Sequence, residues 1–260
     1  MANYSVMAPF YDSFTDDVPY QAWADYLQQL FQKFNASPSI ILDLACGTGS
    51  LTKILAEAGY DMIGTDGSPD MLAEASAKTV HLEQRPLFLC QRMEKLDLYG
   101  TVDAVVCALD SINYLTTQAA LEAAFQRVGL FLNDNGLFIF DVNTDAKFRA
   151  IDMQAFVRES EQCFCVWQAD YDAPQRLMNY YLDFFMANPG DTYTRGTEHH
   201  VERAHTLQEL QTALEKGQMQ LEAVCGELTL SAPAPDADRV FLVARRRPRT
   251  EKCPKQEETR

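Results

Sequence analysis

Positive charge and long apolar runs are both scarce in this chain. Its 260 residues include 22 Lys and Arg against 37 Asp and Glu, which gives a formal net charge of −15. An acidic surface repels nucleic acids and anionic membranes unless a local basic patch is present. The apolar runs all fall short of the roughly 20 residues that a membrane-spanning helix needs. We therefore expect no nucleic-acid partner and no membrane association.

One basic cluster lies at the end of the chain. Residues 245–260 ("RRRPRTEKCPKQEETR") hold seven basic and three acidic residues. The cluster lacks the interleaved aromatic side chains that are typical of nucleic-acid binding. We interpret residues 247–260 as a solvated, flexible tail, and a nucleic-acid or lipid-binding arm is the alternative.

Cysteine is present, but in a pattern that argues against disulfides and metal sites. The seven cysteines are an odd number spread over a long chain, and no secretory leader is recognisable at its start. Disulfide scaffolds are typically short secreted chains. We therefore expect reduced thiols and a cytoplasmic protein. Cys163 and Cys165 lack a second pair at zinc-binding spacing, so we expect no metal.

Strand-like and helix-like patterns alternate from residue 39 onward. The strand-like segments are short and apolar, as suits strands buried on both faces. This alternation predicts a Rossmann-like, doubly wound α/β fold with a mainly parallel, seven-stranded sheet. The expected strands read "SIILDLA", "YDMIGTD", "PLFLCQ", "VDAVVCAL", "GLFIFDV", "MQLEAVCGEL" and "DRVFLVARR".

The alternation breaks between residues 151 and 203. Aromatic and β-branched residues dominate "CFCVWQADYD", "RLMNYYLDFFMA" and "TYTRGTEHHVER" there. This composition predicts an inserted antiparallel β subdomain, which acts as a substrate lid or as a dimer element. Aromatic residues at helical spacing near the start predict an N-terminal helical cap. The expected units are the cap at 1–36, the core at 37–150 and 204–246, the insertion at 151–203 and the tail at 247–260.

The segment "ILDLACGTGSL" joins the first expected strand to a helix through two glycines. A strand that runs into Gly-x-Gly and then a helix presents backbone N–H groups to a ligand. The dinucleotide fingerprint requires a third glycine three residues after Gly49, where this chain has Thr52. The second strand ends on Asp66, whose carboxylate can accept hydrogen bonds from a ribose diol. We therefore expect a ligand that contains a nucleoside but need not carry a pyrophosphate.

Together, "DLACGTG" and "GTDGSPDML" resemble two motifs of the class I S-adenosylmethionine-dependent methyltransferases. The resemblance runs from about residue 40 to residue 142 and resumes in the last two strands. It implies S-adenosylmethionine as the cofactor and S-adenosylhomocysteine as the product. It also implies that Asp43 organises the methionine amine, that Asp66 holds the ribose and that the backbone approaches the cofactor closely. The implied contacts are Tyr11, Asp43, Ala45, Gly47, Gly49, Asp66, Arg92, Met93 and Leu109.

One position departs from the family pattern. Related sequences commonly follow the third strand with an acid that binds the adenine amino group, and Arg92 stands in that place here. Arginine cannot accept a hydrogen bond. Three arrangements remain open: Arg92 stacks on the adenine, Glu94 replaces the acid, or the Met93 backbone N–H reads the base. A solvent-facing Arg92 is the simplest interpretation of its side chain.

The methyl acceptor is expected beyond the carboxyl ends of the strands, where Asp110 and Asp141 follow two of them. Methyl transfer needs alignment and, where the acceptor loses a proton, a general base. A period of two puts Glu198, His200 and Glu202 on one face of a strand. We expect His200 to be the base, with Asp110 and Asp141 as further catalytic residues. A solvated edge strand with ordinary charges is the alternative.

The inserted segment is rich in aromatic rings. They could line an apolar acceptor pocket, build the core of a small sheet or form a subunit interface. The rings are Phe164, Trp167, Tyr171, Tyr180, Tyr181, Phe184 and Phe185. We expect methyl transfer to a nitrogen or oxygen of a small molecule, and a homodimer through the insertion. The alternatives are a non-catalytic nucleoside- or partner-binding module on the same fold and an NAD-linked oxidoreductase.

Overall fold

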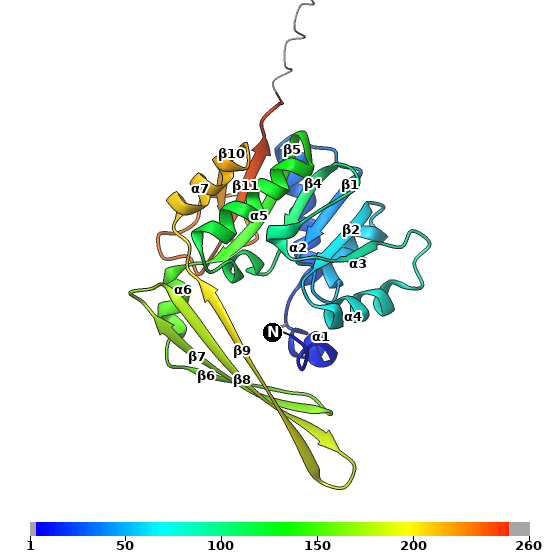
Figure 1. Cartoon of the computed structure of the whole chain (residues 1–260), viewed down its shortest axis with the longest axis vertical. Helices are drawn as coiled ribbons and strands as arrows, with labels where there is room; N and C mark the ends of the chain where they lie inside the picture. The colour runs from blue at the N-terminus through cyan, green and yellow to red at the C-terminus, as the bar shows by residue number, and fades with distance from the viewer. Residues whose placement is uncertain (1–3, 250–260) are drawn as a thin grey trace, which may run out of the picture.

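The computed structural model describes residues 4–249 and contains a seven-stranded and a four-stranded β-sheet (Figure 1). The strand order of the larger sheet is β10-β11-β5-β4-β1-β2-β3. The strands from β5 to β3 in this order are parallel, and β11 runs antiparallel to both of its neighbours. The predicted mainly parallel sheet is thereby confirmed. Its strands are β1 (Ile40–Leu44), β2 (Asp61–Asp66), β3 (Leu87–Cys90), β4 (Val102–Cys107), β5 (Leu132–Asn143), β10 (Met219–Gly226) and β11 (Arg239–Arg246).

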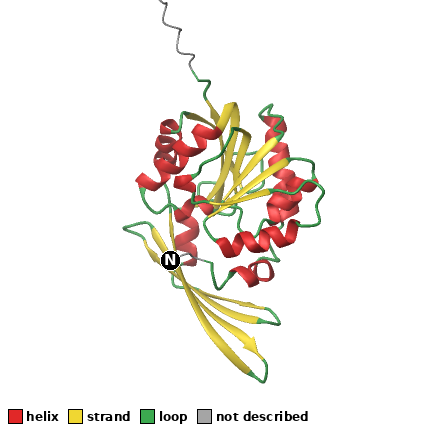
Figure 2. Cartoon of the chain, turned by 45° about the vertical axis from the view of Figure 1, so that its right-hand side comes forward, coloured by secondary structure: helices red, strands yellow, loops and turns green. Residues whose placement is uncertain are grey.

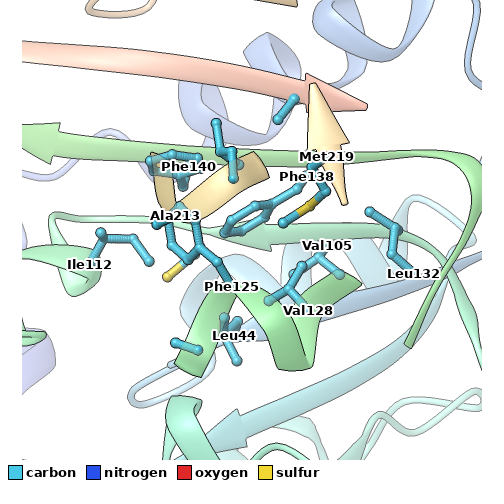
Figure 3. Close-up of a cluster of buried hydrophobic side chains, with 14 of the residues drawn as sticks. Leu44, Val105, Ile112, Phe125, Val128, Leu132, Phe138, Phe140, Ala213 and Met219 are labelled. Atoms are coloured by element: carbon cyan, nitrogen blue, oxygen red, sulfur yellow. The ribbon is translucent and has the colours of Figure 1, made fainter. Parts of the chain in front are cut away.

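Helices cover both faces of this sheet (Figure 2). Because successive strand residues point to opposite faces, Ile41 packs with one helical layer and Leu42 with the other. The layer beside Leu42 contains Phe125, whose ring centroid lies 5.2 Å from those of both Phe138 and Phe140 (Figure 3). One layer comprises α5 (Gln118–Phe131) and α7 (Leu207–Lys216), and the other comprises α2 (Tyr20–Lys33) and α3 (Ser50–Glu57).

Helix α4 (Pro69–Thr79) begins where the sequence places a cap residue before proline. The side chain of Ser68 accepts a hydrogen bond from the backbone N–H of Met71, and Pro69 occupies the first helical position. This start lies directly after β2, so it fixes the chain that follows Asp66. Within residues 4–249, no helix combines the length and apolarity that crossing a membrane requires.

The inserted segment forms the four-stranded antiparallel sheet, which we call the lid sheet. It follows α6 (Asp145–Ile151) and extends away from the core at the carboxyl ends of the parallel strands (Figure 1). Its strand order is β6-β7-β8-β9, so each strand pairs with the next along the chain. The prediction of an antiparallel insertion is confirmed. The strands are β6 (Ala155–Glu159), β7 (Cys163–Asp172), β8 (Leu177–Asn188) and β9 (Thr192–Arg203).

The predicted N-terminal cap is present, but it divides into two parts with different neighbours. Helix α2 packs on the core sheet. Residues 4–14, which we call the N-terminal segment, pack instead against the lid sheet, where Met7 and Phe14 join the cluster around Phe184. This segment contains η1 (Ala8–Phe10) and α1 (Tyr11–Phe14). The apolar spacing that predicts α2 carries no information about which sheet the preceding residues contact.

The beginning of the predicted tail is anchored to the core. The Arg247 backbone N–H donates to the carbonyl of Gln218, and the Arg249 guanidinium pairs with Asp134 at 2.9 Å. Arg249 also donates to the carbonyls of Leu130 and Leu132. Residues 247–249 are therefore not a free tail, and residues 250–260 lie outside the described part of the chain.

Candidate active site

The glycine turn between β1 and α3 adopts three left-handed backbone conformations. Ala45, Gly47 and Gly49 have φ angles of 61°, 54° and 71°. A Cβ on Gly47 would meet no atom within 4 Å, whereas one on Gly49 would lie 2.9 Å from the Ala75 Cβ. Gly47 therefore leaves open space on the ligand side, and Gly49 allows α3 and α4 to pack closely. Gly49 lines none of the three cavities around the turn, and its cofactor contact stays a prediction.

Two carboxylates form hydrogen bonds that hold the turn and the helix after it. Asp43 is buried and accepts a hydrogen bond of 2.5 Å from the hydroxyl of Thr52, the residue that replaces the third glycine. Burial raises the pKa of Asp43 to about 6. Asp66 accepts from the backbone N–H of Gly47 at 3.0 Å and from that of Ser68 at 2.8 Å. Because each of its oxygens keeps a lone pair, Asp66 can still accept hydrogen bonds from a ligand.

A cavity of about 280 Å³, which we call the cofactor cavity, opens beside this turn. It brings together most of the residues that the sequence predicts for the cofactor. Those that line it are Tyr11, Ala45, Gly47, Asp66, Arg92, Met93 and Leu109. Asp43 lines a narrow recess next to it, together with Ala45, Gly47 and Leu109. Tyr4 and Tyr114, which no sequence motif indicates, also form part of the wall.

The Arg92 side chain is mostly exposed and forms an ion pair with Glu94 at 2.6 Å. Both residues and Met93 line the cofactor cavity. Arg92 therefore stays at the cavity rim, as expected for a solvent-facing arginine. That Arg92, Glu94 or the Met93 backbone contacts the adenine stays a prediction.

The loop after β4 is strained and is held by a partly buried arginine. Leu109 and Asp110 have consecutive positive φ angles of 57° and 53°, a conformation that costs free energy in residues other than glycine. Arg239 pairs with Asp110 at 2.7 Å and with Asp141, and the Asp110 backbone N–H donates to Asp141. Burial opposes the charge of Arg239, but the two carboxylates more than offset it and raise the pKa of the guanidinium. The Trp23 ring lies 5.5 Å from this guanidinium.

The positions of the two predicted catalytic aspartates therefore differ. Asp110 lines a second cavity, whereas Asp141 is fully buried and lines neither this cavity nor the cofactor cavity. Asp141 acts behind Arg239 and supports the loop. The predicted contact between Asp141 and the methyl acceptor is not supported by this position, because Asp141 is fully buried and does not line the acceptor cavity.

The second cavity, which we call the acceptor cavity, has a volume of about 560 Å³. It is bounded by the N-terminal segment, the lid sheet and the loop that contains Leu109 and Asp110. Tyr4, Tyr11, Leu109 and Tyr114 line both cavities, so the two adjoin along this shared wall.

The rings of the insertion divide among several places. Trp167 and Tyr180 line the acceptor cavity, and their centroids lie 5.3 Å apart. Tyr171 and Phe184 belong to the apolar core between the lid sheet and the N-terminal segment. Tyr181 is exposed and stacks on His199 on the opposite face of β8 and β9. Phe164 and Phe185 pair with each other at 6.3 Å.

The alternation predicted for β9 is observed. His200 and Glu202 are 2% and 3% exposed and line the acceptor cavity, whereas His199 faces solvent. The imidazole Nε2 of His200 lies 2.8 Å from Glu198 Oε2, and its Nδ1 lies 3.1 Å from the Tyr114 hydroxyl. His200 is therefore not a solvated edge residue. At the shared wall, His200 faces the Tyr114 hydroxyl, and its ring centroid lies 4.5 Å from that of Tyr4.

Three buried polar atoms at the acceptor cavity have no hydrogen-bond partner among the described residues. They are Glu202 Oε2, Asn143 Oδ1 and Trp167 Nε1. Burial raises the pKa of Glu202 well above its usual range, and the negative charge of Asp110 adds to this effect. Unpaired buried polar groups are costly and therefore uncommon in native proteins. A ligand in this cavity would supply their partners.

The sheet order, the glycine turn and the adjoining cavities together define a class I S-adenosylmethionine-dependent methyltransferase. A family profile described as methyltransferase domain matches residues 41–136. The YqeM protein of Bacillus subtilis, which is classed with the methyltransferases, is 31% identical over 245 residues, or 94% of this chain and 97% of that protein. The chain belongs to this methyltransferase family.

Two further matches extend the comparison. A crystal structure of an S-adenosylmethionine-dependent methyltransferase from Clostridium acetobutylicum has a TM-score of 0.83 and 28% identity, covering 94% of this chain and 99% of that one. A glycine/sarcosine N-methyltransferase of Parasynechococcus marenigrum is 32% identical over 123 residues, which are 46% of this chain and 43% of that protein. The expectation of a methyltransferase that uses S-adenosylmethionine is confirmed, and the NAD-linked and non-catalytic alternatives are set aside.

Proposed function

We propose that the protein methylates the nitrogen of a small cationic amine that carries no anionic group. The observation that carries this proposal is the buried Oε2 oxygen of Glu202, which has no hydrogen-bond partner among the described residues and belongs to the wall of the acceptor cavity. Glu202 Oε2 and Asn143 Oδ1 are both acceptors, and a protonated amine has several N–H donors. Pairing with a cation would relieve the cost of burying Glu202 in its charged form.

The cations around the acceptor cavity support the exclusion of anionic acceptors. Arg239, Arg158 and Lys147 line the cavity. Arg239 pairs with Asp110 and Asp141, Arg158 pairs with Asp17 at 2.8 Å, and Lys147 lies 3.8 Å from Asp238. Among residues 4–249, each basic side chain of the cavity wall therefore has a carboxylate partner. A phosphate or carboxylate on the acceptor would have to share a cation with one of these partners.

The cofactor cavity fits S-adenosylmethionine in its chemistry. Asp66 would accept from the ribose hydroxyls, Asp43 would help to organise the methionine amine, and Gly47 allows close backbone approach. Tyr11 and Leu109 would lie between cofactor and acceptor, because both line the two cavities. When bound, the cofactor supplies a methyl group on a positively charged sulfur, which is a good leaving group.

The chain would contribute mostly alignment. Methyl transfer requires the nitrogen lone pair, the methyl carbon and the sulfur to lie in line. Glu202 and Asn143 would bind one amino group of the acceptor, and the rings of Trp167 and Tyr180 would enclose its apolar part. The nitrogen that reacts must be neutral, so a diamine or a ring with two nitrogens could use one for binding and the other for reaction.

The test is transfer of labelled methyl groups to a panel of matched acceptors. Each pair in the panel holds an amine and the same amine with a phosphate or carboxylate added. We expect labelled N-methyl products from the unmodified amines and at least about 10-fold lower kcat/KM for the anionic partners, which corresponds to about 1.4 kcal/mol. Preferential methylation of anionic or oxygen acceptors would contradict the proposal.

Two further expectations stay predictions. Residues 151–203 would also form a homodimer interface, for which the exposed face of the lid sheet, with Tyr181 and Tyr193, provides apolar surface. Sedimentation velocity would test this expectation. The predicted cytoplasmic location is likewise untested.

A further inference from the structure

A chain of hydrogen bonds runs from the wall between the two cavities into the lid sheet. The Tyr4 hydroxyl lies 2.5 Å from the Tyr114 hydroxyl, which lies 3.1 Å from His200 Nδ1. His200 Nε2 continues the chain to Glu198 Oε2 at 2.8 Å. Tyr4 and Tyr114 line both cavities, whereas Glu198 lines neither. The chain therefore has one end at the reacting groups and the other in the protein interior.

The ionised state of Glu198 determines which atom donates and which accepts in each hydrogen bond of this chain. Its other oxygen, Oε1, accepts from the backbone N–H groups of Val6 at 2.7 Å and Met7 at 3.2 Å. Burial raises the pKa of Glu198, but the hydrogen bonds from His200, Val6 and Met7 outweigh it and leave this pKa below its usual value. Glu198 is then an ionised acceptor, so His200 must donate from Nε2.

A neutral His200 that donates from Nε2 must accept at Nδ1. Tyr114 then donates its hydroxyl proton to Nδ1, and its oxygen accepts the proton of Tyr4. The Tyr4 oxygen keeps a lone pair at the shared wall of the cavities. Every hydrogen bond of the chain thus has its donor on the side of the cavities, and the last bond runs from His200 Nε2 to Glu198.

We propose that Tyr4, Tyr114 and His200 form a proton relay that removes the proton of the acceptor nitrogen. As the nitrogen–carbon bond forms, the carbon–sulfur bond breaks and its electron pair stays on sulfur. The acceptor proton passes to the Tyr4 oxygen, the Tyr4 proton to Tyr114, and the Tyr114 proton to His200 Nδ1. The positive charge ends on the imidazolium, which faces Glu198. This relay rests on the proposed function, because it needs an acceptor in the adjoining cavity.

The burial of the Tyr4 and Tyr114 hydroxyls suits groups that transfer a proton without becoming phenolates. Burial raises the pKa values of Tyr4 and Tyr114 well above their usual range, and the charges of Glu202 and Asp110 add to this effect. Their phenolate forms are therefore disfavoured. The proposal changes the predicted role of His200, since Tyr4 is the catalytic residue that meets the acceptor and His200 is the final proton acceptor.

The relay also depends on the docked N-terminal segment. Tyr4 comes from this segment, Tyr114 from η3 (Ser111–Tyr114) and His200 from β9. The backbone N–H groups of Val6 and Met7 hold Glu198, which in turn fixes the His200 ring. A protein whose N-terminal segment is displaced would therefore lack both the Tyr4 hydroxyl and the fixed imidazole.

The kinetic test uses Tyr4→Phe, Tyr114→Phe, His200→Gln and the double variant Tyr4→Phe/His200→Gln, with an amine from the panel as acceptor. We expect each single variant to lower kcat by about 10²-fold with little change in acceptor KM. Residues that act as one chain give non-additive losses, so the double variant should lose no more than the larger single loss. Tyr99→Phe is the matched control and should keep kcat within about 3-fold, because its side chain is exposed and lines neither cavity. Multiplied losses in the double variant, or full kcat in Tyr114→Phe, would overturn the relay.

A second measurement does not need an acceptor. Nitrogen NMR of histidine-labelled protein with S-adenosylhomocysteine present reports which ring nitrogen carries the proton, and His200→Gln assigns the signal. We expect His200 to carry its proton on Nε2 and to accept a hydrogen bond at Nδ1. In Tyr114→Phe, which lacks this hydrogen bond, the Nδ1 chemical shift should move toward that of a nitrogen without a donor partner. A proton on Nδ1 would overturn the relay whether or not an acceptor is found. If no compound of the panel is methylated but His200 shows the expected tautomer, the result would instead count against the proposed function.

Discussion

His205 is a buried residue whose two ring nitrogens have no hydrogen-bond partner among residues 4–249. Burial lowers its pKa to about 4, and the nearby guanidinium of Arg203 acts in the same direction, while Glu209 opposes them. A histidine with a depressed folded-state pKa binds fewer protons in the folded protein than in the unfolded one. The folded state therefore loses stability as the pH falls from about 6.5 to about 4.

This residue gives a prediction for acid stability. We expect His205→Leu to flatten the loss of stability between pH 6.5 and pH 4, where the wild-type histidine would cost up to about 3 kcal/mol. Urea unfolding at several pH values measures the slope. His199→Leu is the control, because His199 is exposed and should leave the slope unchanged. Equal slopes for His205→Leu and wild type would contradict the assignment.

The sequence predicts the residues of the cofactor cavity better than those of the acceptor cavity. Asp66 and Gly47 follow from a local motif, because strand, turn and helix are adjacent in the chain. The pairing of Asp43 with Thr52 is also local, although the sequence analysis treats Thr52 only as a missing glycine. By contrast, Arg239 and Asp141 lie 98 residues apart in the sequence, and no local pattern indicates their contact.

The N-terminal segment connects the cofactor site with the lid sheet. Asp12 accepts from the Thr48 hydroxyl at 2.6 Å and pairs with Lys78 at 2.6 Å, which ties α1 to the glycine turn and to α4. The same segment holds Glu198 of β9 through two backbone N–H groups. Because Tyr11 lines the cofactor cavity, the cofactor would be enclosed only while this segment is docked.

We expect Asp12→Asn to speed cofactor release. The Lys78–Asp12 pair is partly exposed, so its loss should cost little stability but raise the dissociation constant of S-adenosylhomocysteine about 2- to 10-fold. Stopped-flow dissociation and calorimetry measure the effect. Asp25→Asn on α2 is the matched control, because Asp25 contacts only Gln21 among the hydrogen bonds of the described residues. An unchanged release rate in Asp12→Asn would show that the segment does not cover the cofactor.

Alternation and turn signals are sufficient to predict the strands of the core sheet and three strands of the lid sheet, whereas β6 is not among the predicted strands. Each signal comes from residues that are close in sequence, as in the period of two along β9. The packing of the N-terminal segment on the lid sheet is not predictable in this way. It depends on contacts such as that between Val6 and Glu198, which are 192 residues apart.

At the scale of the whole molecule, the core sheet holds the cofactor residues and the lid sheet supplies the far wall of the acceptor cavity. The acidic chain and the paired cations around the cavity favour a cationic acceptor over an anionic one. The central claim is that Glu202 recognises such an amine. The fold and the cofactor follow from the family, whereas the proposed acceptor class rests on this cavity.

The most direct measurement of this claim is labelled-methyl transfer to the best amine of the panel by wild type and by Glu202→Gln. The amide keeps the size of the side chain and removes its charge. We predict at least about 10-fold higher acceptor KM in Glu202→Gln, the scale for losing a charge-assisted hydrogen bond, with an unchanged dissociation constant for S-adenosylhomocysteine. An acceptor KM equal to that of wild type, with cofactor affinity intact, would contradict the account.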